Sequence, residues 1–323
     1  MDGAIATVRP GRHDRCVDDE QGAGFAMGAL REIAWRYLAE GDAGRWETLV
    51  RPSIRLATED EVWDAAEEPS AAGLGGLPRL PRDIDWPTGP EGAPLAFIAA
   101  LDCAALLSGW LDIPLPAQGV LTFFAATPLD RGPSGLYRAG RCGPTHGRVL
   151  YIPAGTPCEV RAAPPGVAVF PGIRLIALRD PTAPFPDHPR VRHAFDLHTR
   201  AELFEHPLYD QSFLDELAEQ AARFEHRVGG YASAGAVEYE AALGPTEPAA
   251  ETHPRDAGPH DTERALEWVM LAQFQCDPMA EMLACDRQDG RPGSDRRGVL
   301  MWLIRHEDLA RQSFSEAVLL RAF

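Results

Sequence analysis

The chain contains no lysine and no asparagine, so all 31 of its basic residues are arginine. Without lysine, a Schiff base, a P-loop lysine and a Ser-x-x-Lys nucleophile are impossible. A protein-kinase site is excluded because it needs both missing residue types, and N-glycosylation is excluded because it needs asparagine. These two absences remove several large enzyme classes before any motif is considered.

Long hydrophobic runs and basic clusters are missing as well. The apolar runs have strand length rather than the ~20 residues that a membrane span needs, and residues 1–22 contain no apolar signal-peptide core. The formal net charge is −17, which repels nucleic acid and anionic membranes and attracts basic proteins. We therefore expect a cytoplasmic protein with a basic protein partner and with no nucleic-acid or membrane partner. The oligomeric state stays open.

The six cysteines show no CxxC spacing, so we expect them to be reduced and buried. His188, His193 and His198 suggest a metal site, but neither a helix nor a strand brings residues five apart to one side. Surface histidines on a proline-broken segment explain them better. The sequence thus predicts no metal site and no cofactor.

The hydrophobic patterns and turn residues that the chain does contain predict an α+β fold with mainly antiparallel sheets and an N-terminal helical segment. Residues 1–23 are polar and predict a flexible tail, followed by one domain over 24–323. Leu30, Ile33, Ala34, Tyr37 and Leu38 have the spacing of a buried helix face. Strands are predicted at 53–57, 95–101, 119–126, 148–153, 166–170, 173–178, 266–274 and 298–305.

The clearest helical pattern covers 210–230, with Gly229 or Gly230 as its C-terminal stop. A second helical stretch, 44–50, lies nearer the N-terminus, and the chain closes with a helix and a short element over 306–320. Residues 244–261 lack an apolar anchor and predict a flexible loop.

The segment 75–87, "GGLPRLPRDIDWP", concentrates glycine and proline. Gly75 and Gly76 allow positive φ, whereas Pro78, Pro81 and Pro87 fix φ and cannot donate to a sheet. We expect an extended strap outside any sheet, held to the core by Trp86.

Two stretches repeat the same order of features. "LGGLP", "LAFIAALDCA" and "GVLTFF" in the first half are followed by "VGGYA", "WVMLAQFQCD" and "GVLMWL" in the second. This order predicts an internal duplication of a β-rich half, with half 1 at about 50–180 and half 2 at about 205–323. Chance is the alternative, because apolar strands resemble one another.

The same ordered motifs resemble the YwqG-like family, a bacterial domain family of unknown function, over roughly residues 50–323. The resemblance implies a non-catalytic α+β module with antiparallel sheets and carries no established activity. Family positions proposed for binding are Gly75, Gly76, Pro78, Trp86, Asp102, His226, Gly229, Gly230, Tyr231, Gln273 and Asp277. Ala100, Ala232 and the segment 294–298 depart from the family pattern.

These residues admit two readings. His226 either contacts a ligand or partner, or it interacts with the carbonyls at a helix C-terminus. Gln273 and Asp277 are either polar pocket groups or hydrogen-bonding groups at a strand end.

Two functions follow. The first is a non-enzymatic binding module, in one version an immunity-type protein for a basic toxin. The second is a hydrolase or metal-dependent enzyme that uses His226, Asp102 and Asp277, which requires at least two of them in one pocket.

Overall fold

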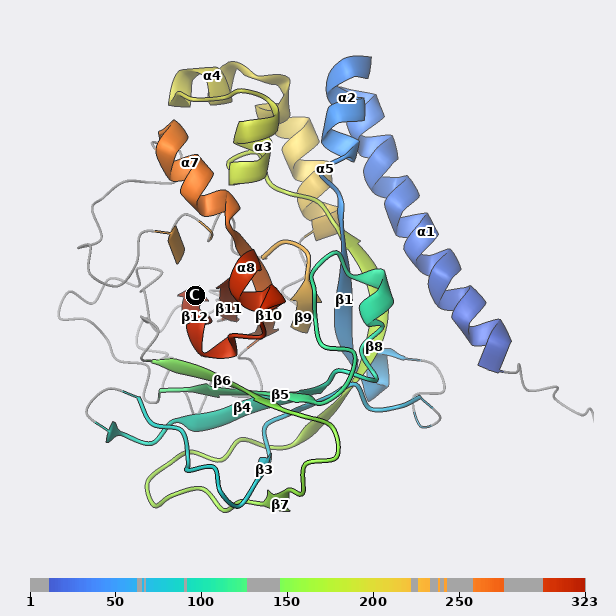
Figure 1. The fold of residues 1–323 in the computed structure, drawn as a ribbon. Coiled ribbons are helices and arrows are strands. Elements are labelled where there is room, and N and C mark those ends of the chain that lie inside the picture. The colour runs from blue at the N-terminus through green and yellow to red at the C-terminus, as the bar shows by residue number, and fades with distance from the viewer. Residues whose placement is uncertain are drawn as a thin grey trace, which may run out of the picture.

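The computed structural model describes residues 12–62, 66, 68–89, 92–126, 146–221, 226–232, 238, 241–242, 258–275 and 299–322. Among these residues, side chains are described from residue 23 onward, except those of 221 and 322. A large antiparallel sheet dominates this part of the chain (Figure 1). Helices α1 to α5 and α7 gather at one end of the sheet, and the small sheet β3–β7 lies at the other end.

The helices of the described residues divide into α-helices and short 3-10 helices. The α-helices are α1 (Arg12–Tyr37), α2 (Glu40–Glu47), α3 (Pro189–Ala194), α4 (Arg200–Glu205), α5 (Gln211–Ala221), α7 (Pro259–Leu266) and α8 (His306–Ala310). The 3-10 helices are η1 (Glu59–Glu61), η4 (Ser108–Trp110), η5 (Pro207–Tyr209) and η8 (Phe314–Glu316).

The strands of the large sheet have the order β12-β11-β10-β9-β1-β8-β2-β4-β5-β6. Their bounds are β1 (Arg51–Thr58), β2 (Ala72–Leu74), β4 (Ala96–Asp102), β5 (Val120–Ala125), β6 (Gly147–Ile152), β8 (Ile173–Thr182), β9 (His226–Gly229), β10 (Trp268–Gln275), β11 (Val299–Arg305) and β12 (Val318–Ala322). The small sheet pairs β3 (Arg79–Leu80) with β7 (Glu159–Val160).

The large sheet curls until its two edge strands approach each other. A Cβ atom on Gly147 of β6 would lie only 2.7 Å from Cβ of Leu319 on β12. The sheet is therefore nearly a barrel, and side chains of its inner face fill the interior. Phe123, Phe274 and Trp302 form an aromatic cluster there, with ring centroids 5.2 to 5.7 Å apart.

The sheet order has a matching arrangement on either side of its centre. We call β1, β2, β4, β5 and β6 the first strand set, and β8 to β12 the second strand set. The first strand of each set pairs with the second strand of the other set: β1 pairs with β9, and β8 pairs with β2. The β4–β5 and β10–β11 pairings are each irregular at one residue, Ile98 and Leu271 respectively.

Just beyond these irregularities, each set has a row of three paired residues. Gly73 pairs with Ala100, which pairs with Thr122. In the second set Arg227 pairs with Gln273, which pairs with Met301. The two rows therefore occupy corresponding positions in the sheet.

The α+β fold and most predicted elements are confirmed. The predicted helix face on α1 is confirmed, because Leu30, Ile33, Ala34 and Leu38 are buried. Trp86 holds the strap as expected: its Nε1 donates to the Leu95 carbonyl oxygen at 2.8 Å, and its ring packs edge-on against Phe124.

Several predicted boundaries differ from the structure. α1 begins at Arg12, so residues 12–23, which were predicted as part of a flexible tail, are helical. The expected loop 244–261 includes the start of α7, because Pro259 and the capping carboxylate of Asp261 favour helix initiation. The strap is not wholly outside a sheet, since Arg79 and Leu80 lie between prolines and pair with β7.

Two predicted elements are wrong. Residues 166–170 form no strand, because Gly166 takes a positive φ after two prolines and so turns the chain. The helix predicted over 210–230 ends at Ala221, and His226–Gly229 is strand β9 instead. β9 is held by β1 and β10, which are distant in sequence and invisible to a local pattern.

Candidate functional site

A groove runs over the outer face of the first strand set. We call it the strap groove; it has a volume of about 490 Å³. The strap forms one wall with Gly75, Leu77, Pro78 and Arg79, and residues 153–156 with Cys158 form the other. The size and mainly apolar lining are those of a ligand-binding cleft.

The floor of the strap groove is the row Gly73, Ala100 and Thr122. A Cβ atom built on Gly73 would meet no other atom within 4 Å. Gly73 also has no positive φ, so its backbone does not require glycine. The open space above β2 therefore results from a missing side chain and not from the path of the backbone.

The two ends of the strap groove differ in chemistry. Phe97 closes one end and packs with Phe124 beneath the strap. At the other end of β4, Asp102 is exposed and its Oδ1 accepts the Ala104 backbone N–H at 3.0 Å. A bound molecule would thus meet apolar carbon at one end and a carboxylate at the other.

The strap wall is fixed by backbone geometry at Gly75 and Gly76. Both residues have positive φ, and the Gly76 N–H donates to the Phe170 carbonyl oxygen at 2.8 Å. A side chain on Gly75 would collide with the Pro171 carbonyl oxygen. The diglycine is therefore required for the strap to lie against 170–172.

Cys158 on the opposite wall is half-buried and free, whereas Cys103 is buried and free. Burial, followed by the charge of Asp102, raises the pKa of the Cys103 thiol to about 11. The expectation of buried thiols is thus confirmed for Cys103 and not for Cys158. The side chains of Cys16, Cys142, Cys276 and Cys285 lie outside the described residues.

The second diglycine has the same backbone conformation. Gly229 and Gly230 have positive φ, and a side chain on Gly230 would collide with Ser53 and Thr182. The Tyr231 N–H then donates to Thr182 Oγ1 at 3.1 Å. These glycines end β9 and bring Tyr231 under the helices, so they stop a strand and not the predicted helix.

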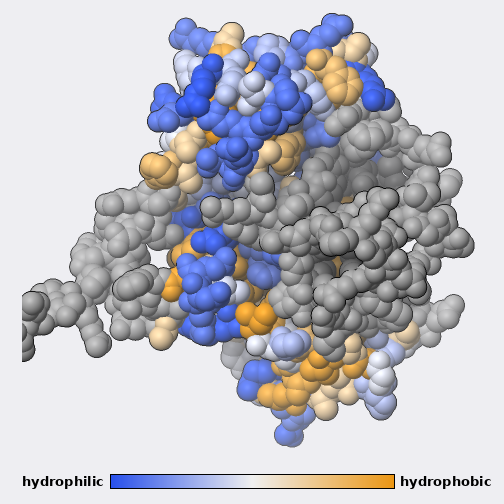
Figure 2. Space-filling view, turned by 180° about the vertical axis from the view of Figure 1, so that it is seen from behind, coloured by the Kyte–Doolittle hydropathy of each residue, from blue (hydrophilic) through white to orange (hydrophobic). Residues whose placement is uncertain are grey.

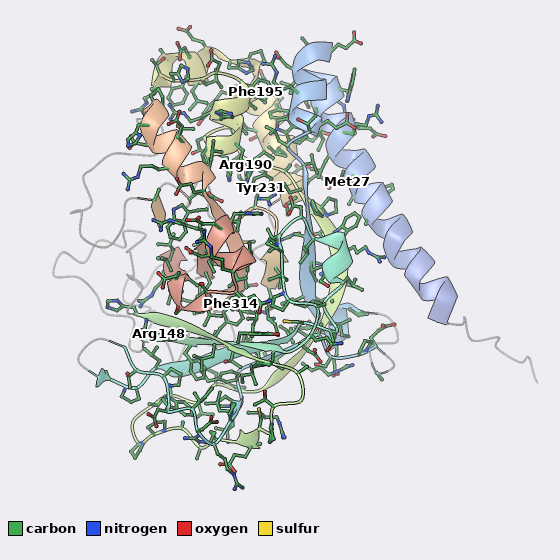
Figure 3. All side chains as sticks on the ribbon, viewed as in Figure 1. Met27, Arg148, Arg190, Phe195, Tyr231 and Phe314 are labelled. Carbon is green, nitrogen blue, oxygen red and sulfur yellow. The ribbon has the colours of Figure 1, made fainter. Side chains whose placement is uncertain are left out.

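Tyr231 belongs to a buried polar cluster between the helices and the sheet (Figure 3). Its hydroxyl donates to the Leu49 carbonyl oxygen at 2.6 Å, its ring faces the Arg51 guanidinium, and His188 packs edge-on at 4.6 Å. Burial raises the pKa of Tyr231 well above its usual value. The phenol is therefore neutral and has a structural partner.

Glu238 and His188 form the deepest part of this cluster. His188 Nε2 lies 3.1 Å from Glu238 Oε1, although the alignment is too poor for a hydrogen bond. Burial alone would raise the pKa of Glu238, but the neighbouring His188 holds it below the ordinary value. His188 is thus buried, so its interpretation as a surface histidine was wrong, whereas His193 and His198 are exposed.

His226 is buried on the barrel side of β9. Its Nδ1 accepts the Gln275 backbone N–H at 3.0 Å, and burial lowers the pKa of the imidazole to about 4. Gln273 is fully buried on β10. Asp277 lies outside the described residues. His226 therefore joins two neighbouring strands and is not the helix-capping residue of the sequence interpretation.

The predicted residues do not assemble into one centre. Gly75, Pro78 and Asp102 line the strap groove, with Gly76 and Trp86 supporting its wall, whereas Tyr231 lies in the polar cluster. His226 lines neither the strap groove nor the pocket of about 350 Å³ beside α1 and α5. Among those residues, no group of three His, Cys, Asp or Glu side chains is placed to hold a metal.

A second pocket of about 350 Å³ lies between α1, α5 and the sheet. Arg227 points into it, and its guanidinium donates to Asp180 Oδ2 at 2.7 Å and to Ser53 Oγ at 2.6 Å. The charged groups of this pocket, Arg227 and Asp180, are therefore already paired with each other. The pocket is a poorer candidate for a binding site than the strap groove.

Sequence reasoning missed the floor residues Gly73, Ala100 and Thr122. The available signal was a glycine inside the short strand "AGL", because a strand-interior glycine often marks close approach by another molecule. Ala100 was noted as a departure from a family pattern, but its neighbours could not be identified without the strand register.

The fold and groove together define a mixed α+β protein, mainly β, with a nearly closed antiparallel sheet of ten strands in the described residues. The chain belongs to a family described as a domain of unknown function (DUF1963), which matches residues 72–321. Comparison with curated proteins gives no significant match. Among the helices of the described residues, each is too short or too polar to cross a membrane.

Proposed function

We propose that the chain is a non-enzymatic binding module that holds a positively charged protein partner in the strap groove. The observation that carries this proposal is Gly73. Its strand geometry suits a larger residue, and the missing side chain leaves the groove open. A strand-interior glycine weakens a sheet, so an open floor at this position is best explained by a ligand that occupies the space.

The charge of the chain supports a basic partner. A net charge of −17 accelerates encounter with positively charged proteins and disfavours acidic ones. One specific version is a cytoplasmic, immunity-type protein that covers a basic toxin. That version is supported by electrostatics and by the groove, since capping a partner needs only a complementary surface.

The alternative, a hydrolase or metal-dependent enzyme, has weaker support. It needs Asp102 and a general base within reach of one substrate. Asp102 lines the strap groove, but His226 faces the barrel side of another strand and is held by Gln275. The described residues thus offer binding groups in the groove without a paired base.

We also propose that the two strand sets arose by internal duplication within a YwqG-like member of the family. The supporting observations are the paired diglycines with positive φ, the irregularities at Ile98 and Leu271, and the repeated sequence Ile-Arg-Leu in β1 and β8. In this division β8 belongs to the second half. Reconstructed ancestral sequences of the two halves should converge if the proposal is correct, and stay unrelated if chance produced the match.

The binding proposal is tested by purifying the tagged chain from its own host and identifying stoichiometric partners by mass spectrometry. The wild type should retain a basic protein, and Gly73→Val should lose it because the new side chain fills the groove. Gly109→Val is the matched control, since Gly109 also faces open space but lies outside the groove. A wild-type monomer with no partner, or equal retention by Gly73→Val, would contradict the proposal.

A further inference from the structure

The geometry points to a specific occupant of the strap groove: a lysine or arginine side chain of the partner, with its aliphatic stem over Gly73 and its cationic end at Asp102. This inference rests on the proposed function and adds the chemical group that is recognised. It follows from three features of the groove, namely its gradient of polarity, the state of Asp102 and the surface around it.

The gradient of polarity runs along β4. Phe97, Ala100 and Asp102 all line the groove, so the lining changes from aromatic carbon to methyl to carboxylate in a single strand. Leu77 and Pro78 cover the apolar part from the strap side. Lysine and arginine have matching chemistry, because an aliphatic stem can lie on apolar surface while the charged end reaches a polar group.

Asp102 is free to accept a cation. Its Oδ1 is oriented by the Ala104 N–H, and within the described residues it forms no ion pair. The chain's own arginine in the groove, Arg79, is held by the opposite wall: its guanidinium donates to the Cys158 carbonyl oxygen at 3.0 Å. Nearby Arg82 is neutralised by Glu159 at 2.8 Å. Within the described residues Asp102 therefore pairs with neither of these arginines, and its carboxylate is left to accept a cation from another molecule.

The corresponding position in the second strand set strengthens the assignment. The register that aligns Ala100 with Gln273 aligns Asp102 with Gln275, a neutral residue. In the second set the corresponding row is Arg227, Gln273 and Met301, and these larger side chains are buried. They fill the position that corresponds to the open floor of the first set. The set with the open floor is thus the set that carries the carboxylate.

The surface beside the groove favours a macromolecule over a free amine. Leu77, Val160 and Val169 are exposed by 44%, 56% and 43%. Figure 2 shows hydrophobic residues gathered at the end of the molecule that carries β3 and β7, in contrast to the mostly hydrophilic helical end. A protein that inserts one cationic side chain would cover this apolar rim as well.

The absence of lysine makes a direct test available. A carbodiimide couples carboxylates to amines, and this chain has no lysine amine of its own to react. A fluorescein-labelled tetralysine peptide is coupled to the wild type, and the modified residue is located by mass spectrometry. Coupling should concentrate at Asp102; labelling spread evenly over surface carboxylates would overturn the inference.

Affinity for the same peptide is then measured by fluorescence anisotropy at low ionic strength. Asp102→Asn should weaken binding about tenfold, the loss expected for one charge-assisted hydrogen bond. Glu263→Gln removes the same charge from an exposed site on α7 and should change affinity less than twofold. A peptide with Nε-acetylated lysines keeps the stem without the charge and should not bind.

The results separate this inference from the proposed function. If Gly73→Val loses the host partner while Asp102→Asn binds tetralysine like the wild type, the groove binds its partner without a cationic side chain and the inference fails alone. Equal weakening by Asp102→Asn and Glu263→Gln would show nonspecific attraction and also overturn it. If Gly73→Val changes neither partner nor peptide binding, both proposals fail.

Discussion

The first and second strand sets place different side chains on corresponding positions of one sheet. Gly73, Ala100 and Thr122 leave a groove in the first set, whereas Arg227, Gln273 and Met301 fill the same row in the second. Arg227 is tied to Asp180 and Ser53, so its bulk contributes to stability. The two sets thus share a backbone framework, and their outer-face side chains decide which set has an open groove and which has a filled row.

The largest expected effect is on the free energy of unfolding, and it tests whether the inward-facing residues of the two sets contribute equally to stability. Phe123 and Trp302 occupy corresponding positions and pack against each other with centroids 5.2 Å apart. Replacing either with alanine should lower the free energy of unfolding by about 4 kcal/mol, because both changes leave a cavity. Chemical denaturation measures the effect, with exposed Val160→Ala as the control. A loss below about 1 kcal/mol at one site would contradict the shared core.

The two diglycines should respond to alanine in opposite order. Gly75→Ala and Gly230→Ala should each cost about 3 kcal/mol, since positive φ and a steric collision add together. Gly76→Ala and Gly229→Ala should cost only about 1 kcal/mol, because mainly the conformational penalty applies. Thermal and urea unfolding of the four variants would test this pattern. Four equal losses would show that the collisions relax.

At this pair of corresponding positions, only the second set should make the free energy of unfolding depend on pH. His226 has a folded pKa of about 4 against an ordinary value of 6.5, whereas Ala72 occupies the corresponding position in the first set. The unfolded chain binds a proton more readily, so the stability contribution is full above pH 6.5 and declines as the pH falls toward 4.

Between these limits the decline should reach about 2 to 3 kcal/mol. His226→Gln retains an acceptor for the Gln275 N–H and should lack this part of the pH dependence. Urea unfolding of both proteins at several pH values measures the difference. Parallel pH profiles for wild type and variant would contradict the assignment.

The smallest pair of effects compares the two rows directly. Arg227→Ala should cost about 2 kcal/mol, because Asp180 and Ser53 lose a partly buried partner. Gly73→Val should change the free energy of unfolding by less than about 0.5 kcal/mol, since strand geometry accepts valine and the space is empty. A large loss for Gly73→Val would mean that the groove is needed for folding and not for a ligand.

The sequence predicted most strands correctly because their apolar residues are local signals. It also identified both diglycines and the pinning role of Trp86. It failed at 226–229, where the sequence pattern predicted a continuing helix and the structure has strand β9. β9 is defined by hydrogen bonds to β1 and β10, and those partners lie far away in the chain. His188 was predicted at the surface but is buried, and the reason is the same: its neighbour Glu238 lies fifty residues away in the chain.

The candidate site was predicted only in part. Asp102, Gly75 and Pro78 were selected as members of motifs, and the groove indeed contains them. Gly73, Thr122 and Cys158 were not selected, because each is unremarkable until strand register and the returning chain at 153–158 place it beside the others. A groove is a property of several segments and has no linear signature.

The sequence alone determined the composition-level properties of this protein: an acidic chain without lysine, a turn-rich antiparallel sheet and two glycine pairs that require positive φ. These follow from side-chain chemistry and local backbone sterics. The tertiary structure alone decided that the two edge strands of the sheet approach each other, that one row of its outer face is open and that Asp102 lies at the end of that opening. The physical reason is that register between distant strands sets which side chains become neighbours.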